Sequence, residues 1–415
     1  MNGRPVPEGL LRGLAPQVLG ALLRRYGQLE ACEDAAQEAM LAAAVSWPVD
    51  GLPRSPLAWL VTVATRRLID VTRADTARRR READDAVLRP TDPPVVSHHD
   101  DDNLDLFFMC CHPALSETSQ LALTLRAVGG LTTAEIAHAF MVPEATMTQR
   151  LVRARQTLRS SAVRFGAVPA DDRVSRLRVV LHVLYLIFNE GYVASTGPDA
   201  HRPELTREAI RLTRLLRVAV PDDGEVAGLL ALMLLTDARS AARVDAAGLV
   251  ALADQDRTRW DRDRIEEGLA LLDATLGRFS VGTYQVQAAI AALHDEAATA
   301  AETDWKQILA LYDVLERVDP RPAVTLNRAV AVGAVLGPRA ALALLGTLDP
   351  DSAVARGHRL HSVRAHLLEQ IGDRAAARDA YARAARGTRS LQERQYLLKQ
   401  VARLAPPTGC RQSGR

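Results

Sequence analysis

The sequence is poor in cysteine and contains no long apolar run. Cys32, Cys110, Cys111 and Cys410 are too few and too irregularly spaced for a disulfide framework, which agrees with a reducing compartment. No stretch reaches the roughly 18 uninterrupted apolar residues of a membrane span, and residues 1–14 lack the charged and apolar regions of a secretion signal. We therefore expect a cytoplasmic protein.

Alternating β-branched residues, which mark strands, are scarce, whereas alanine, leucine and arginine at helical spacing are abundant. The sequence therefore predicts an all-α fold. The phosphate loop G-x-x-x-x-G-K-[ST], the zinc motif H-E-x-x-H and the nucleophile elbow G-x-S-x-G are missing, so we expect a non-enzyme without cofactor or metal. Because the net charge is only +2, any nucleic-acid binding must depend on local clusters of positive charge.

The helical pattern is interrupted between residues 82 and 103 by proline, histidine and aspartate, which we interpret as a flexible linker. At 415 residues, the chain is long enough for two or three domains. It divides into two small helical blocks, 8–81 and 104–164, and a long helical extension at 173–404.

The first block contains two helices that carry recognisable signals. Glu33, Asp34 and Glu38 give the first an acidic start that complements its dipole, and Trp47 follows. Ser55-Pro56 begins the second, with an N-cap followed by proline. Its predicted buried stripe is Leu60, Ala64, Leu68 and Val71.

Positive charge accumulates at the end of the second helix. From Arg66 to Arg81 there are seven arginines against Asp70 and Asp75, a local excess of +5. Such a cluster attracts phosphates, although a charge run alone is more often a solvated helix end than a DNA site.

The segment D-A-A-Q-E, Trp47 and the segment P-L-A-W-L-V-T-V-A-T-R-R-L-I-D-V together resemble region 2 of the sigma-70 family. In that family the first segment contacts the clamp of core RNA polymerase, and the second faces the minus-ten promoter element. The resemblance implies polymerase contacts by Asp34, Gln37 and Glu38. It implies minus-ten DNA contacts by Arg66, Arg67, Asp70 and Arg73. Arg66 departs from the family, in which many members carry asparagine.

The second block contains a predicted helix-turn-helix. Thr132 and Glu135 have the spacing of a capping box, Met141-Val142-Pro143 is the turn, and a second helix follows. Its predicted buried stripe is Met147, Leu151, Ala154 and Leu158. A purely structural helical hairpin would show the same stripe, so this pattern alone leaves DNA reading open.

The segment G-L-T-T-A-E-I-A-H-A-F-M-V-P-E-A-T-M-T-Q-R-L-V-R-A-R resembles sigma region 4, which reads the minus-thirty-five element in the major groove. The buried stripe leaves Thr146, Gln149, Arg150 and Arg153 projecting outward, with Glu144 at the helix start, and Arg155 continues the positive charge. With the resemblance, these six residues are the expected minus-thirty-five contacts.

Cys110-Cys111-His112 invites a zinc interpretation, because thiolate and imidazole are preferred zinc ligands. Adjacent cysteines do not easily occupy two corners of one tetrahedron, so we expect buried thiols instead. In the extension, the apolar run from Val179 to Phe188 predicts a core helix in which His182 is packed.

Near the C-terminus, residues 360–386 have the pattern of a tetratricopeptide repeat, with a turn at Gly372 and packing by Ala376, Ala380 and Tyr381. Helix ends at Asp319-Pro320 and Asp349-Pro350 recur near the repeat length of about 34 residues. Such repeats usually offer a surface to a protein partner, although a self-stabilising scaffold is the alternative.

Tracts such as L-Y-L-I-F-N-E-G-Y and T-D-W-K-Q-I-L-A-L-Y-D resemble the extension of extracytoplasmic-function (ECF) sigma factors of the ECF42 group. The resemblance implies a sigma factor that binds core RNA polymerase and promoter DNA and is controlled by its fused C-terminal domain. The alternative is a helix-turn-helix regulator that acts without polymerase and carries a C-terminal sensor.

Overall fold

The structure is a computed structural model. It describes residues 8–79, 101–161, 163, 165–166, 168–193, 201–245, 248–275, 277–348 and 357–405. Across these ranges the chain forms eighteen α-helices, which confirms the predicted all-α class. One antiparallel pair of two-residue strands, β1 (Val244–Asp245) and β2 (Gly248–Leu249), is the exception. The expected linker lies mostly outside the described residues, and its last positions already belong to helix α4.

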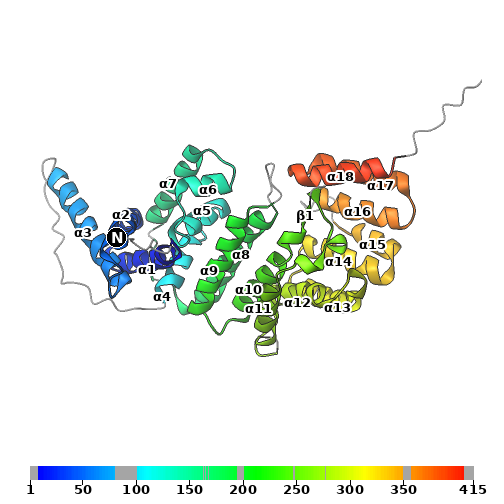
Figure 1. The fold of residues 1–415 in the computed structure, drawn as a ribbon, viewed down its shortest axis with the longest axis horizontal. Helices are drawn as coiled ribbons and strands as arrows, with labels where there is room; N and C mark the ends of the chain where they lie inside the picture. The colour runs from blue at the N-terminus through cyan, green and yellow to red at the C-terminus, as the bar shows by residue number, and fades with distance from the viewer. Residues whose placement is uncertain are drawn as a thin grey trace, which may run out of the picture. The chain divides into compact units, whose positions relative to one another are not determined.

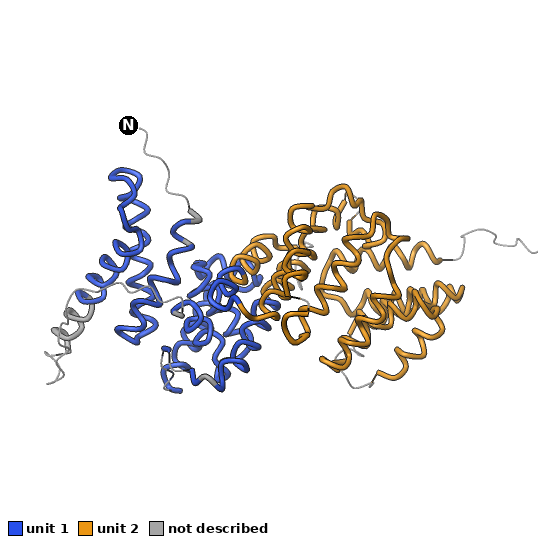
Figure 2. Tube along the Cα trace, turned by 90° about the horizontal axis from the view of Figure 1, so that it is seen from below, with its two compact units in different colours: residues 1–186, 214–221 blue, residues 187–213, 222–415 orange. Residues whose placement is uncertain are grey.

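Contacts divide the chain into two compact units, which Figure 2 colours separately. Unit 1 comprises residues 1–186 and 214–221, and unit 2 comprises residues 187–213 and 222–415. Both expected N-terminal blocks therefore fall within unit 1, and most of the expected extension falls within unit 2.

Unit 1 is built from the first helices of the chain, drawn from blue to green in Figure 1. They are α1 (Glu8–Tyr26), α2 (Leu29–Asp50), α3 (Pro56–Arg79), α4 (Asp101–Cys110), α5 (Glu117–Ala127), α6 (Thr133–Ala139), α7 (Glu144–Ser160) and most of α8 (Ala170–Tyr192).

Helices α1, α2 and α3 pack against one another, and α3 begins at the predicted Pro56. Trp47 of α2 meets Trp59 of α3 edge to face, with ring centroids 5.5 Å apart. The predicted stripe on α3 is buried at the three positions where side chains are described: Leu60, Ala64 and Leu68.

Two predictions for unit 1 were wrong. Helix α2 begins at Leu29, so Glu33 lies inside the helix and Glu30 is the acidic residue of its first turn. His182 is not packed in a core: its side chain is 43% exposed and lies 3.2 Å from the Glu117 carboxylate. The run around it is buried as expected, at Val180, Leu181, Val183 and Leu184.

Unit 2 consists mainly of helices and short 3-10 turns in the part that the structure describes, which ends at residue 405. The helices are α9 (Pro203–Ala219, in part), α10 (Gly224–Asp237), α11 (Arg262–Asp273), α12 (Thr283–Glu296), α13 (Trp305–Val318), α14 (Pro322–Leu336), α15 (Pro338–Leu345), α16 (His358–Gln370), α17 (Arg374–Gly387) and α18 (Leu391–Arg403). The 3-10 turns are η1 (Ser240–Ala242), η2 (Leu252–Asp254), η3 (Arg257–Arg259) and η4 (Ala300–Glu302).

Helices of unit 2 pack mainly on their neighbours in sequence, with α16 on α17 and α17 on α18 as one example. Ala380 and Tyr381 are buried as predicted, and Ala377 takes the fully buried place expected for Ala376, which is half-buried. Gly372 has φ 83°, as the expected turn requires. Asp319 caps the end of α13, whereas Asp349-Pro350 lies outside the described residues.

Candidate nucleic-acid interface

The helix-turn-helix of unit 1 is formed by α6 and α7. Thr132 Oγ1 accepts a hydrogen bond from Glu135 N at 3.1 Å, and Glu135 Oε2 accepts one from Thr132 N at 2.7 Å. This is the predicted capping box, which satisfies two backbone N–H groups at the start of α6. The turn contains Met141 at φ 51°, and α7 begins directly after Pro143. The local sequence thus sets where each helix starts.

Helix α7 has one buried face and one exposed face. Met147, Leu151, Ala154 and Leu158 are all buried, which confirms the predicted stripe. The opposite face is polar and open to solvent. Glu144, Thr146, Gln149 and Arg153 are exposed, and Arg150 is half-buried. This surface has hydrogen-bond donors and acceptors of the kinds that read base edges and phosphates.

Arg155 does not share this exposed face. Its Nε donates to Glu33 Oε2 of α2 at 2.7 Å, and only 15% of the Arg155 side chain and 3% of the Glu33 side chain are exposed. Arg155 was expected to continue the positive charge toward minus-thirty-five DNA, whereas in this structure its guanidinium pairs with a protein carboxylate. Its contact with DNA stays a prediction that requires this ion pair to open.

The Glu33 carboxylate is buried but incompletely paired. Burial raises the pKa of Glu33, and the guanidinium groups of Arg155 and Arg126 act in the opposite direction. Glu33 Oε1 and Arg126 Nε have no hydrogen-bond partner among the described residues. A buried ion pair with an unsatisfied oxygen adds little net stability, because desolvation offsets the attraction of the charges.

Sequence reasoning did not assign Glu33 to any site. Ala36, Ala43 and Trp47 follow it on the same face of α2 and are buried, as Glu33 is. A carboxylate that continues an apolar stripe is the signal that could have identified it. Almost no charged residue is buried without a partner, so a partner on another helix would have been expected.

Two further ion pairs connect helices of the two sigma-like blocks: one joins α7 to α2, and the other joins α1 to α4. Arg159 Nη2 of α7 lies 3.0 Å from Glu30 Oε2 of α2, with both side chains at least half exposed. Arg24 of α1 pairs with Asp102 of α4, whose side chain is 12% exposed. Asp102 was expected in the linker, but it lies in the helix that packs on α1.

The residues expected to contact polymerase lie on α2. Asp34 and Glu38 are exposed, and Gln37 is half-buried. Glu38 Oε2 lies 3.3 Å from Arg67 Nε of α3, with both side chains more than half exposed. One expected polymerase contact thus pairs with one expected DNA contact, and such exposed pairs are weak.

The other residues expected at the minus-ten element lie on α3. Arg66 and Asp70 are exposed beside Arg67. Arg73 lies further along the same helix, but its side chain is outside the described set.

Three cysteines of unit 1 are buried free thiols, as predicted for Cys110 and Cys111. Burial raises the pKa of Cys32 and of Cys111 to about 12, and Cys111 Sγ lies 3.5 Å from Thr124 Oγ1. Within the part of the chain that the structure describes, no group of three or more metal-ligating side chains comes together. Nor does any described helix combine the length and apolar character needed to cross a bilayer.

Comparison with known proteins assigns these parts of the chain. Residues 10–81 match sigma-70 region 2 and residues 108–158 match sigma-70 region 4. Residues 176–276 match a family of unknown function, DUF6596. No solved structure matches the chain.

An uncharacterized protein of Rhizobium meliloti (strain 1021) is 43% identical over 404 residues, which cover 94% of each chain. The similarity thus extends well beyond the two sigma regions and through the extension. With both sigma regions in order on one chain, the protein belongs to the sigma-70 family of RNA polymerase sigma factors.

Proposed function

We propose that this chain is an ECF-type sigma factor of the ECF42 kind, which binds core RNA polymerase and directs transcription from specific promoters. The exposed polar face of α7 is the observation that carries the proposal. Glu144, Thr146, Gln149 and Arg153 stand opposite a fully buried stripe, so helix α7 can enter a major groove without disturbing its own core. Arg150, at the edge of this face, adds a guanidinium for a phosphate or a guanine.

Region 2 has the complementary role in this proposal. The exposed carboxylates of Asp34 and Glu38, with Gln37 between them, contact core polymerase. Arg66, Arg67, Asp70 and Arg73 of α3 face the opened minus-ten strand. Glu38 must release Arg67 when both engage their partners, which costs little because the pair is exposed.

The contact between Arg155 and Glu33 makes this conformation a closed one. Arg155 reaches DNA only after leaving Glu33, and α2 carries both Glu33 and the residues proposed to contact polymerase. We therefore propose that docking of α2 on polymerase favours release of Arg155. The unsatisfied Oε1 of Glu33 supports this step, because the pair is not held by a complete set of hydrogen bonds.

The C-terminal extension is proposed to regulate the sigma regions as a tetratricopeptide-like domain that engages a protein partner. Its support is the serial packing of α13 to α18 around three small cores. In repeat proteins each helix pair likewise rests on its neighbours and presents one continuous surface.

Run-off transcription with purified core polymerase tests the main proposal. Specific transcripts should appear only when the protein is added, and Arg150→Ala with Arg153→Ala should abolish them. Arg178→Ala, which removes an exposed arginine of α8, is the matched control and should transcribe like the wild type. Tight binding to promoter duplex without polymerase, with no stimulation of core enzyme, would favour a polymerase-independent helix-turn-helix regulator instead.

A further inference from the structure

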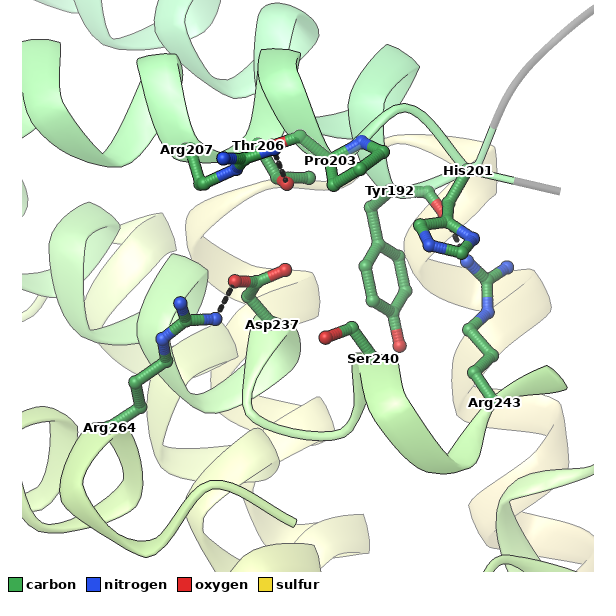
Figure 3. A pocket seen from close by; sticks show the side chains of 9 residues that line it. All are labelled: Tyr192, His201, Pro203, Thr206, Arg207, Asp237, Ser240, Arg243 and Arg264. Carbon is green, nitrogen blue, oxygen red and sulfur yellow. Dashed lines mark hydrogen bonds and ion pairs between the residues drawn. The ribbon is translucent and has the colours of Figure 1, made fainter. Parts of the chain in front are cut away.

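A cavity of about 150 Å³ lies within unit 2, in the segment that matches the family of unknown function. Figure 3 shows its walls: the end of α8 at Tyr192, the start of α9, the end of α10 at Asp237, and the turn that follows. A space of this size accommodates more than a single water molecule. It is therefore large enough for a small ligand.

The lining of this cavity carries more positive than negative charge. Arg207, Arg243 and Arg264 line it together with His201, and Asp237 is the one carboxylate among its lining residues. Asp237 and Arg264 form an ion pair, and Asp261 lies 3.3 Å from the same guanidinium. Arg264 is thus neutralised by protein groups, which leaves Arg207 and Arg243 as the surplus.

No carboxylate lies within ion-pair distance of Arg243 among the described residues, although the charge of Glu393 acts on it. Arg243 Nη1 donates to the backbone carbonyl of Tyr192, and its Cζ lies over the Tyr192 ring, 4.1 Å from the ring centroid. Burial lowers the pKa of Arg243, so the protein surroundings do not fully compensate for the charge. An anion in the cavity would provide that compensation.

Arg207 approaches from the opposite wall, on α9. Its Nε donates to the Pro203 carbonyl at 3.0 Å, which fixes the side chain and leaves its terminal nitrogens for a ligand. Guanidinium groups bind carboxylate and phosphate groups through paired hydrogen bonds, and more tightly than they bind neutral acceptors. The Ser240 hydroxyl and Tyr192 ring add a polar and an aromatic contact beside them.

The geometry points to a binding site for a small anionic metabolite, whose carboxylate or phosphate group pairs with Arg207 at one wall while Arg243 adds positive charge from the other. Arg243 also lines a second cavity of about 240 Å³, where it meets side chains of α16 and α18 such as His358 and Glu393. A ligand that interacts with Arg243 would therefore change the electrostatic surroundings of α16 and α18 as well. Binding itself does not depend on the proposed sigma function.

Thermal denaturation and calorimetric titration of the full chain test the site. Inorganic phosphate and succinate are the two probes, each compared with sodium chloride at equal ionic strength. At least one probe should raise the unfolding midpoint and give saturable heat, because ligand binding to the folded state stabilises it. If only phosphate stabilises the protein, the ligand carries a phosphate group. If only succinate does, the ligand carries a carboxylate.

Arg207→Gln should weaken binding of the effective probe about tenfold or more, because a hydrogen-bonded ion pair is lost. Arg207 is exposed, so this variant keeps the fold. Arg278→Gln is the matched control: it removes a 68% exposed arginine of unit 2 outside the cavity and should bind like the wild type. The proposal is overturned if neither probe acts beyond sodium chloride, or if Arg207→Gln binds as tightly as the wild type.

Discussion

Arg155 of α7 donates its Nε to the Glu33 carboxylate of α2 at 2.7 Å, across 122 residues of sequence. One residue was expected to contact DNA, and the other lies beside the residues expected to contact polymerase. This ion pair, beside the exposed pair of Arg159 with Glu30, thus connects the two surfaces that are expected to contact DNA and polymerase. We expect its state to report whether region 2 and region 4 are engaged with each other or free for their partners.

A double-mutant cycle measures this coupling. Glu33→Gln or Arg155→Gln alone should destabilise the contact between α2 and α7 by about 2–3 kcal/mol, because each leaves a buried partner unpaired. The double variant should lose less than the sum of the two. Hydrogen exchange read by mass spectrometry in α2 and α7 follows local opening, which suits a chain of several domains. Additive effects would show that the pair is not coupled.

Glu33→Gln should also strengthen binding of promoter duplex in the absence of polymerase. The variant removes the charge that holds Arg155, so an additional guanidinium becomes free for phosphate contact. Fluorescence anisotropy with labelled duplex measures the change, which should shrink as salt is added. Glu30→Gln, which frees only the already exposed Arg159, should not reproduce the gain. Equal affinities for Glu33→Gln and the wild type would argue against the closed form.

Thr132→Ala tests the start of the helix-turn-helix. The substitution removes the side-chain acceptor of the capping box and should cost about 1 kcal/mol of stability. Thr148→Ala serves as its comparison, because the exposed Thr148 hydroxyl only donates to the Glu144 carbonyl of its own helix. Chemical denaturation followed by circular dichroism should separate the two variants. Equal stability of the Thr132→Ala and Thr148→Ala proteins would show that the capping box does not stabilise the fold.

Gly228→Ala should destabilise unit 2, although alanine normally favours a helix. A Cβ at Gly228 of α10 would lie 2.6 Å from the backbone nitrogen of Gln285 on α12, so the two helices must move apart. Overpacking of this kind costs about 1–3 kcal/mol. Gly13→Ala in α1 meets nothing within 4 Å and should gain roughly 0.5–1 kcal/mol. Differential scanning calorimetry should therefore show shifts of opposite sign for the two variants.

His294 makes the stability of unit 2 depend on pH. Burial, with Arg239 and Arg257 nearby, lowers the pKa of His294 from 6.5 to about 4, and its ring lies 5.3 Å from that of Trp305. Below pH 6.5 the unfolded chain binds a proton that the folded chain does not. Stability is therefore complete above pH 6.5 and is lost as the pH falls toward about 4.

Between pH 6.5 and pH 5 the loss should be about 2 kcal/mol. Urea unfolding followed by tryptophan fluorescence at both pH values measures it. His294→Gln does not titrate and should lose less stability over this interval. An identical pH dependence in both proteins would assign the effect to other groups.

The local features of region 4 could be predicted from the sequence because they depend on residues close together in the chain. Thr132 and Glu135 are three residues apart, and Met147, Leu151, Ala154 and Leu158 follow one helical period. The role of Arg155 could not be predicted in this way. Arg155 and Arg153 are the same residue type two positions apart on α7, so the sequence does not distinguish their roles. The carboxylate that pairs with Arg155 lies 122 residues away in the sequence.

The error at His182 has a similar origin. Its apolar neighbours predicted a buried ring, but the ring lies toward Glu117 of α5, which the sequence does not place beside α8. The cavity of unit 2 was likewise not predicted, because Arg207 and Arg243 reach it from different elements. Helix periodicity gives the buried face of each helix, whereas pairs between distant helices require the tertiary structure.

The buried thiols of Cys32, Cys110 and Cys111 can report how often this part of the protein opens. Only a thiolate reacts readily with an alkylating reagent, and at neutral pH these sulfurs are protonated and shielded from solvent. Their labelling rate is therefore limited by how often the surrounding helices separate. Promoter DNA and polymerase can each be added to the same reaction. The change in the labelling rate then measures how much each one increases the frequency of opening.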